Sequence, residues 1–200
     1  MINISENGKK ALKIIFSDYL ANYNSYNIRD KIGISQGGSL KLLRSLKEKG
    51  LLTSEKMGNA IFYKTNLENG YLIKLQELIY SDYSSFSSFV KGWISQLGSL
   101  APYSKAILLF GSILMKEKAA NDVDIGIILK KKEDYKKLEA MIKEINEQNR
   151  LKIHTLFLTE ESFERKLKEK DKPLLDIVRS CIVIHGQDLF VKVLKNAQKV

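Results

Sequence analysis

Residues 105–112 read KAILLFGS, and residues 122–129 read DVDIGIIL. The first stretch is a continuous apolar run that ends in Gly-Ser, and the second opens with two aspartates in alternation with apolar residues. A strand points successive side chains to opposite faces, so Asp122, Asp124 and Gly126 lie on one face and Val123, Ile125, Ile127 and Leu129 on the other. We therefore predict two buried strands, with a pair of carboxylates at the start of the second.

The two aspartates point the same way, with Cα atoms about 6.5–7 Å apart along the strand. That spacing lets Asp122 and Asp124 hold one or two magnesium ions, which prefer carboxylate and phosphate oxygens. A solvated strand end that carries two surface aspartates is an equally good explanation of the pair alone.

Gly111 and Ser112 favour the metal-site explanation. Glycine permits a tight turn and a close approach of the backbone, and Ser112 can begin a short helix whose free N–H groups bind phosphate. Nine residues separate Ser112 from Asp122. A strand, Gly-Ser, a nine-residue spacer and Asp-Val-Asp on a second strand form a much narrower pattern than either half.

This pattern resembles the fingerprint of the DNA polymerase beta-type nucleotidyltransferases, and within them the minimal nucleotidyltransferase branch. Residues 158–163, 172–174 and 183–186 are similar to the tail of that branch in proteins with an N-terminal winged helix. The resemblance implies that Gly111 and Ser112 cradle the triphosphate of a nucleotide. It also implies that Asp122 and Asp124 hold two Mg²⁺ or Mn²⁺ ions that activate a hydroxyl and neutralise pyrophosphate.

The chain departs from this family at the next strand, residues 151–158, which contains no acid where the family usually has a third carboxylate. His154 is a candidate replacement as catalytic base or metal ligand, and a packed or surface histidine is the alternative. Lys116 is a candidate phosphate contact, although a solvated loop lysine explains it as well. Glu160 and Glu161 are better explained as favourable charges at a helix start after Thr159.

Two functions stay open for this part of the chain. One is an active transferase that moves a nucleoside monophosphate to a hydroxyl of a protein, nucleic acid or small molecule. The other is a transcriptional regulator whose degenerate transferase domain senses nucleotide or mediates assembly.

Upstream, apolar residues recur at helical spacing over 9–20 and 36–49, with a shorter helix before Gly33-Ile34-Ser35. Gly33 is a typical helix end and Ser35 a typical N-cap, which together predict the turn of a helix-turn-helix. Residues 51–56 and 60–65 read as a hairpin. Three helices followed by a hairpin resemble bacterial and archaeal winged-helix regulators.

We expect this winged helix to bind double-stranded DNA, with the helix at 36–49 in the major groove and the hairpin near phosphates. A protein-docking module is the alternative. Winged-helix DNA-binding proteins usually dimerise, and we expect the helix at 67–80 to form the interface of a homodimer. The candidate DNA-contacting residues are Ser35, Gln36, Ser39, Lys41, Arg44, Lys47, Lys56 and Lys64.

The composition of the chain is consistent with a DNA-binding protein. The chain has 200 residues, 33 basic and 23 acidic side chains, a net charge of +10 and 44% hydrophobic residues, which suits a folded protein with a polyanionic partner. One cysteine, Cys181, and two histidines exclude an internal disulfide and a structural zinc site built on cysteine. No apolar run approaches the ~18–20 residues of a membrane span, so we expect a cytoplasmic protein without membrane contact.

The expected fold class is α+β with two domains. Residues 1–66 form the winged helix, 67–82 a linker or dimerisation helix, and 83–200 a nucleotidyltransferase α/β domain with a small mixed sheet. In the last, a helix at 133–147 connects the strand at 122–129 to that at 151–158, and three shorter helices follow.

Overall fold

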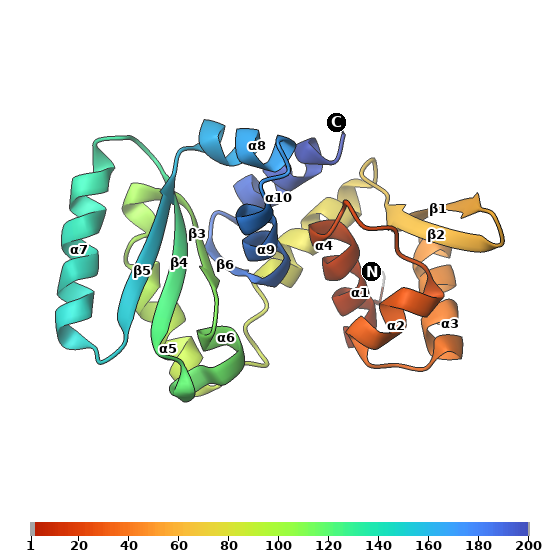
Figure 1. The fold of residues 1–200 in the computed structure, drawn as a ribbon, viewed down its shortest axis with the longest axis horizontal. Helices are drawn as coiled ribbons and strands as arrows, with labels where there is room; N and C mark the ends of the chain where they lie inside the picture. The colour runs from red at the N-terminus through yellow and green to blue at the C-terminus, as the bar shows by residue number, and fades with distance from the viewer. Residues whose placement is uncertain (1–2, 200) are drawn as a thin grey trace. The chain divides into compact units, whose positions relative to one another are not determined.

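The computed structural model describes residues 3–199 and divides the chain into two compact units, residues 1–79 and 80–200. Figure 1 shows the first unit as helices with a small hairpin and the second as a sheet covered by helices. None of the helices within residues 3–199 is long and apolar enough to cross a membrane.

The first unit contains three helices followed by an antiparallel hairpin, in the predicted order. The hairpin pairs Leu52 with Thr65 at its open end and Met57 with Ala60 at its tip. Its elements are α1 (Glu6–Ser17), α2 (Ser25–Ile32), α3 (Gln36–Glu48), β1 (Leu52–Met57), β2 (Ala60–Thr65) and α4 (Gly70–Tyr80).

The predicted turn between α2 and α3 is confirmed in detail. Gly33 ends α2 in the left-handed conformation, with φ of 80°. The Ser35 hydroxyl accepts a hydrogen bond from the backbone N–H of Gly38 and so caps α3. Together the two residues set the angle at which α3 leaves α2.

Helix α4 contributes side chains to the core of the first unit. Its side chains Leu72, Leu75 and Ile79 are buried in the same cluster as Leu12 of α1 and Leu43 of α3. The segment 67–82, expected to be a linker or dimerisation helix, contains α4, which begins at Gly70 and buries its apolar stripe in the core of the first unit.

The second unit is built around a four-stranded mixed sheet in the order β5-β4-β3-β6. The predicted strands are confirmed, and the sequence pattern missed β6, which has only four residues. The elements are α5 (Ser88–Gly98), β3 (Ser104–Phe110), α6 (Ile113–Lys116), β4 (Asp122–Leu129), α7 (Asp134–Gln148), β5 (Lys152–Leu158), α8 (Glu160–Lys168), α9 (Lys172–Ser180), β6 (Ile182–His185) and α10 (Gln187–Ala197), with single 3-10 turns at Ala101–Tyr103 and Glu117–Ala119.

Strand direction decides which residues meet at one end of the sheet. β3 runs antiparallel to β4, which pairs the end of the first strand, Phe110, with Asp124 near the start of the second. β5 runs parallel to β4, and its His154 is the Cα partner of the same Asp124. The end of β3, the Gly-Ser turn and the beginnings of β4 and β5 thus come together at one end of the sheet.

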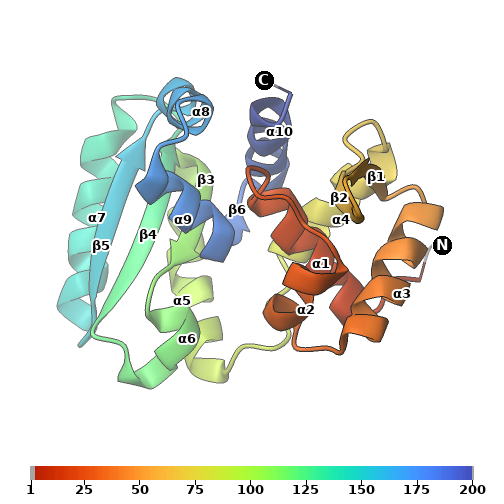
Figure 2. The ribbon, with the colours of Figure 1, turned by 45° about the vertical axis from the view of Figure 1, so that its right-hand side comes forward.

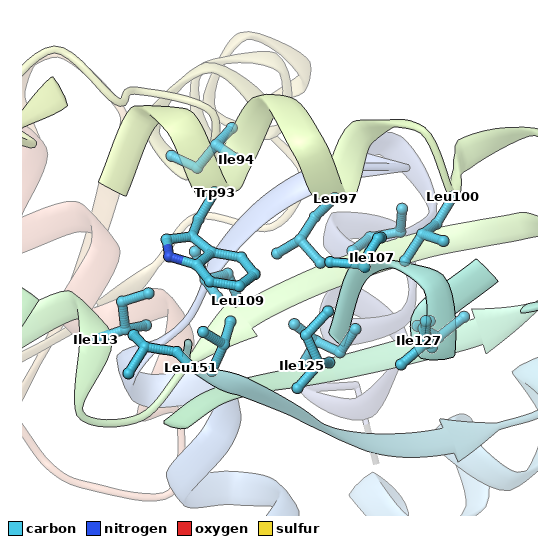
Figure 3. Close-up of a cluster of buried hydrophobic side chains, with 14 of the residues drawn as sticks. Trp93, Ile94, Leu97, Leu100, Ile107, Leu109, Ile113, Ile125, Ile127 and Leu151 are labelled. Atoms are coloured by element: carbon cyan, nitrogen blue, oxygen red, sulfur yellow. The ribbon is translucent and has the colours of Figure 1, made fainter. Parts of the chain in front are cut away.

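Helices cover both faces of this sheet (Figures 1 and 2). One face packs against α5 and α7 through a large apolar cluster, in which Trp93 lies over the sheet beside Leu109 and Ile125 (Figure 3). The other face carries α8 and α10 toward the end of the sheet where β4 finishes. α6 lies at the opposite end, where β4 begins with the two aspartates.

Candidate functional site

The turn after β3 brings the backbone against a carboxylate. Gly111 has φ of 80°, a conformation that L side chains rarely adopt. A Cβ atom built on it would lie 2.1 Å from Oδ2 of Asp124. Only glycine fits here, because any side chain would strain the backbone and displace the aspartate.

The two aspartates and the serine form one polar group at the start of β4. Strand alternation turns Asp122 and Asp124 to the same face, as predicted, while Val123 between them is fully buried in the apolar cluster. The Ser112 hydroxyl lies 3.4 Å from Oδ1 of Asp122, at the long limit of a hydrogen bond. The turn therefore positions its hydroxyl toward the carboxylate pair.

His154 joins this group from the neighbouring strand. Its Nδ1 lies 3.6 Å from Oδ2 of Asp122 and 3.8 Å from Oδ1 of Asp124. The imidazole is 66% exposed, whereas the carboxylates are 33% and 28% exposed, respectively. The histidine thus stands on the solvent side of two half-buried acids.

The surroundings of Asp124 oppose its ionisation. Burial is the main cause that raises the pKa of Asp124, the negative charge of Asp122 adds to it, and His154 acts in the opposite direction. Two carboxylates held this close, one of them with a raised pKa, are typical of a site that gains by binding a cation.

This shift predicts a pH-dependent stability in chelator-treated protein. At pH 7 the ionised Asp124 carboxylate opposes folding, so Asp124→Asn should raise the melting temperature. The penalty is relieved as the pH falls through the raised pKa and is gone below the ordinary value, so the gain should shrink between pH 7 and pH 4. Thermal unfolding across this range measures it, and a gain that grew toward acid pH would contradict the assignment.

The donor set fits a divalent cation. One ligand atom from each of Asp122, Asp124 and His154 lies within 4.8 Å of the other two, the only such group of three among the His, Cys, Asp and Glu side chains of residues 3–199. Two carboxylates and an imidazole are hard to intermediate donors, which suit a dication that also binds phosphate oxygens. Three protein ligands leave positions open for a substrate.

Other predicted residues of this unit lie outside the group. Lys116 ends α6 with an exposed side chain, and no ion pair within residues 3–199 joins it to either aspartate. Glu160 begins α8 beyond the far end of β5 and forms an ion pair with Lys105. The length of β5 therefore separates Glu160 from the two aspartates.

In the first unit, the predicted basic residues are exposed on two elements. Lys41, Arg44 and Lys47 recur every three residues along one side of α3, while Lys56 of β1 and Lys64 of β2 are exposed on the hairpin. This arrangement keeps five positive charges available to a polyanion.

Ser39 is a correction to the predicted DNA-contacting set. Its side chain is fully buried, and its hydroxyl donates to the backbone oxygens of Ser25 and Gln36 at 2.6 and 2.8 Å. It ties α3 to the start of α2 and cannot reach a ligand. Ser35 caps α3, whereas Gln36 is exposed at the first turn.

Arg29 is a residue that the sequence pattern missed. Its guanidinium lies 4.5 Å from the ring centre of Tyr26, and its Nη1 donates to Oε1 of Gln36 at 3.5 Å. Because Tyr26 and Arg29 are three residues apart on one helix, the sequence alone could have predicted that their side chains contact each other. The contact with Gln36 depends on the turn between α2 and α3, which only the tertiary structure defines.

The mixed sheet, the Gly-Ser turn and the paired aspartates all belong to the second unit. Residues 90–183 match a family model described as a nucleotidyltransferase domain. A nucleotidyltransferase domain is therefore present within the second unit, from α5 to β6. Searches of curated proteins and of solved structures gave no match.

Proposed function

We propose that the second unit transfers a nucleoside monophosphate from a nucleoside triphosphate to a hydroxyl acceptor, with Mg²⁺ or Mn²⁺ held by Asp122 and Asp124. One observation carries this proposal. The Asp124 carboxylate lies against the backbone of Gly111, where no side chain fits, and Asp122 and Ser112 adjoin it. A bare backbone beside two carboxylates is what a site needs to bring a triphosphate and its metal ions together.

In this reaction the acceptor oxygen forms a bond to the α-phosphorus, and the bond from that phosphorus to the bridging oxygen of pyrophosphate breaks. Asp122 and Asp124 would hold and orient the cations, which when bound would neutralise charge at the phosphates and lower the pKa of the acceptor hydroxyl. Gly111 and Ser112 would give the triphosphate room and polar contacts. The hydroxyl proton leaves to water on the open side of the carboxylates.

The test combines binding and transfer. Calorimetry with each nucleoside triphosphate and a divalent cation measures binding by the purified protein. The same samples, incubated with α-labelled nucleotide and cell lysate, report transfer through label on an acceptor. Label that appears without the protein, or that is the same with and without a chelator, would count against a metal-dependent transferase.

A nucleotide-sensing regulator is the second candidate, and the composition of β5 favours it. No residue from Lys152 to Leu158 is acidic, so the site lacks a third carboxylate on the strand beside the pair. Losing such a base or ligand commonly costs ~10²–10⁴ in rate. Tight nucleotide binding without label on any acceptor, together with a change in DNA affinity on nucleotide addition, would favour this candidate.

For the first unit, we propose a winged helix that binds double-stranded DNA, with α3 in the major groove and the β1–β2 hairpin against the backbone. The supporting observation is the row of exposed Lys41, Arg44 and Lys47 on α3, with Lys56 and Lys64 exposed on the hairpin. Cations on both elements suit phosphates on either side of a groove.

This proposal predicts a change in salt dependence. Arg44→Ala with Lys47→Ala should weaken duplex binding about 10–100-fold at low salt and reduce the slope of log K against log[salt] by about 2, because two fewer phosphates are neutralised. Fluorescence anisotropy at several salt concentrations measures both. Lys9→Ala with Lys74→Ala is the matched control, since it removes two lysines that are in ion pairs with Glu6 and Glu77. An unchanged slope in the α3 variant would reject this surface.

We further propose that the protein is a cytoplasmic homodimer with α4 at the dimer interface. Leu78 and Tyr71 of α4 are 67% and 40% exposed, a large apolar exposure for one helix. Leu78→Glu should convert a dimer to a monomer in light scattering after size exclusion. A monomeric wild-type protein at micromolar concentration would remove this part of the proposal.

A further inference from the structure

The third donor of the site differs in kind from the other two. The parallel register of β4 and β5 places His154 beside Asp124, and the ring nitrogen Nδ1 faces both carboxylates. Separations of 3.6 and 3.8 Å are too long for hydrogen bonds. The imidazole therefore stands close to the acids without being bonded to either.

These separations lie within the range found between ligands of one cation. With metal–ligand bonds of about 2.1 Å, adjacent ligands of an octahedral ion lie about 3.0 Å apart and opposite ligands about 4.2 Å apart. Both Nδ1–O distances fall in this interval. An ion between the three groups would also offset the repulsion between Asp122 and Asp124.

We propose that His154 is a metal ligand and that it makes this site prefer a first-row transition-metal dication, represented by Mn²⁺, over Mg²⁺. The inference deepens the proposed function, on which it rests. Mg²⁺ strongly prefers oxygen ligands and gives up its water reluctantly, whereas imidazole nitrogen is a good ligand for transition-metal dications. A neutral imidazole also adds no negative charge, which leaves Mg²⁺ with two carboxylates only.

The charge and exposure of the site point the same way. The half-buried carboxylates bring the electrostatic attraction that any dication shares, so they do not discriminate between Mg²⁺ and Mn²⁺. Of the three donors, only the exposed imidazole of His154 should bind Mn²⁺ and Mg²⁺ with different strength. Selectivity should therefore depend on residue 154 and total affinity on residues 122 and 124.

The experiment compares Mn²⁺ and Mg²⁺ affinities of the full chain by calorimetry, with and without a nucleoside triphosphate. We expect wild-type protein to bind Mn²⁺ at least about tenfold more tightly than Mg²⁺. His154→Ala should weaken Mn²⁺ binding about tenfold and leave Mg²⁺ binding within about threefold. His154→Asp should bring the two affinities to within about threefold by strengthening Mg²⁺ binding.

Two further measurements keep the test independent of variant folding. Pulsed electron paramagnetic resonance of Mn²⁺ in the wild-type protein should show coupling to a directly bound ¹⁴N nucleus. His185→Ala is the matched control, because this second histidine pairs with Ile107 near the other end of the sheet. It should keep both the nitrogen coupling and the Mn²⁺ preference, and thermal unfolding checks that each variant is folded.

The outcomes separate the inference from the function beneath it. Equal Mn²⁺ and Mg²⁺ affinities that require Asp122 and Asp124, with no nitrogen coupling, would overturn the role of His154 and leave the proposed transferase standing. Absence of any cation binding, even with nucleotide, would overturn both. A nitrogen coupling lost in His154→Ala and kept in His185→Ala would establish the ligand.

Discussion

The Asp122→Asn/Asp124→Asn double variant should lose nucleotidyl transfer by at least about 10³-fold, together with cation-dependent nucleotide binding. Neutralisation of phosphate charge by bound metal ions is worth several kcal/mol at the transition state, and asparagine removes the charges that hold those ions. The DNA affinity of the chain should change less than twofold, because both residues lie in the second unit.

Transfer of α-labelled nucleotide measures the first effect and anisotropy with a DNA duplex the second. The matched control is Asp176→Asn/Asp188→Asn, which removes two exposed carboxylates from α9 and α10 and should keep full transfer. Label transfer that survived in the Asp122→Asn/Asp124→Asn protein would show that the metal site lies elsewhere.

Gly111→Ala should reduce transfer by at least about 10²-fold and lower the melting temperature. The left-handed conformation of residue 111 costs a non-glycine residue about 1–2 kcal/mol. In addition, the new methyl group would lie 2.1 Å from Oδ2 of Asp124, so the carboxylate must move away from the position in which it would hold a cation. Thermal unfolding and label transfer measure the two consequences.

A double-mutant cycle separates the two causes. Against an Asp124→Ala background, Gly111→Ala should destabilise less, because the backbone cost remains and the carboxylate contact is gone. Gly92→Ala on α5 is the control: its Cβ would meet nothing within 4 Å, and alanine should stabilise that helix by roughly 0.5–1 kcal/mol. Equal destabilisation by Gly111→Ala in both backgrounds would show that the Asp124 contact contributes nothing.

Most elements of the fold could be predicted because their periodicity is strong. The apolar run of β3 and the alternation of β4 are unmistakable, and the structure begins β4 at Asp122 as predicted. β6 was missed because four residues after a helix carry too little pattern. The packing of α4 could not be predicted for a different reason: an amphipathic helix does not reveal which core will bury its apolar stripe, and the first unit buries that of α4.

For the candidate site, local sequence pattern is enough to predict the chemistry of the aspartate pair and of the turn. Alternation along one strand puts Asp122 and Asp124 on one face whatever the fold, and a Gly-Ser after an apolar run indicates a tight turn. The position of His154 depends on strand order and direction, because the parallel pairing of β5 with β4 places His154 beside Asp124. Burial of Ser39 likewise came from packing of α3 on α2, because a hydroxyl on a helix can point to solvent or to a backbone oxygen with the same sequence. Local pattern thus specifies which groups the strands carry, and tertiary pairing decides which groups meet.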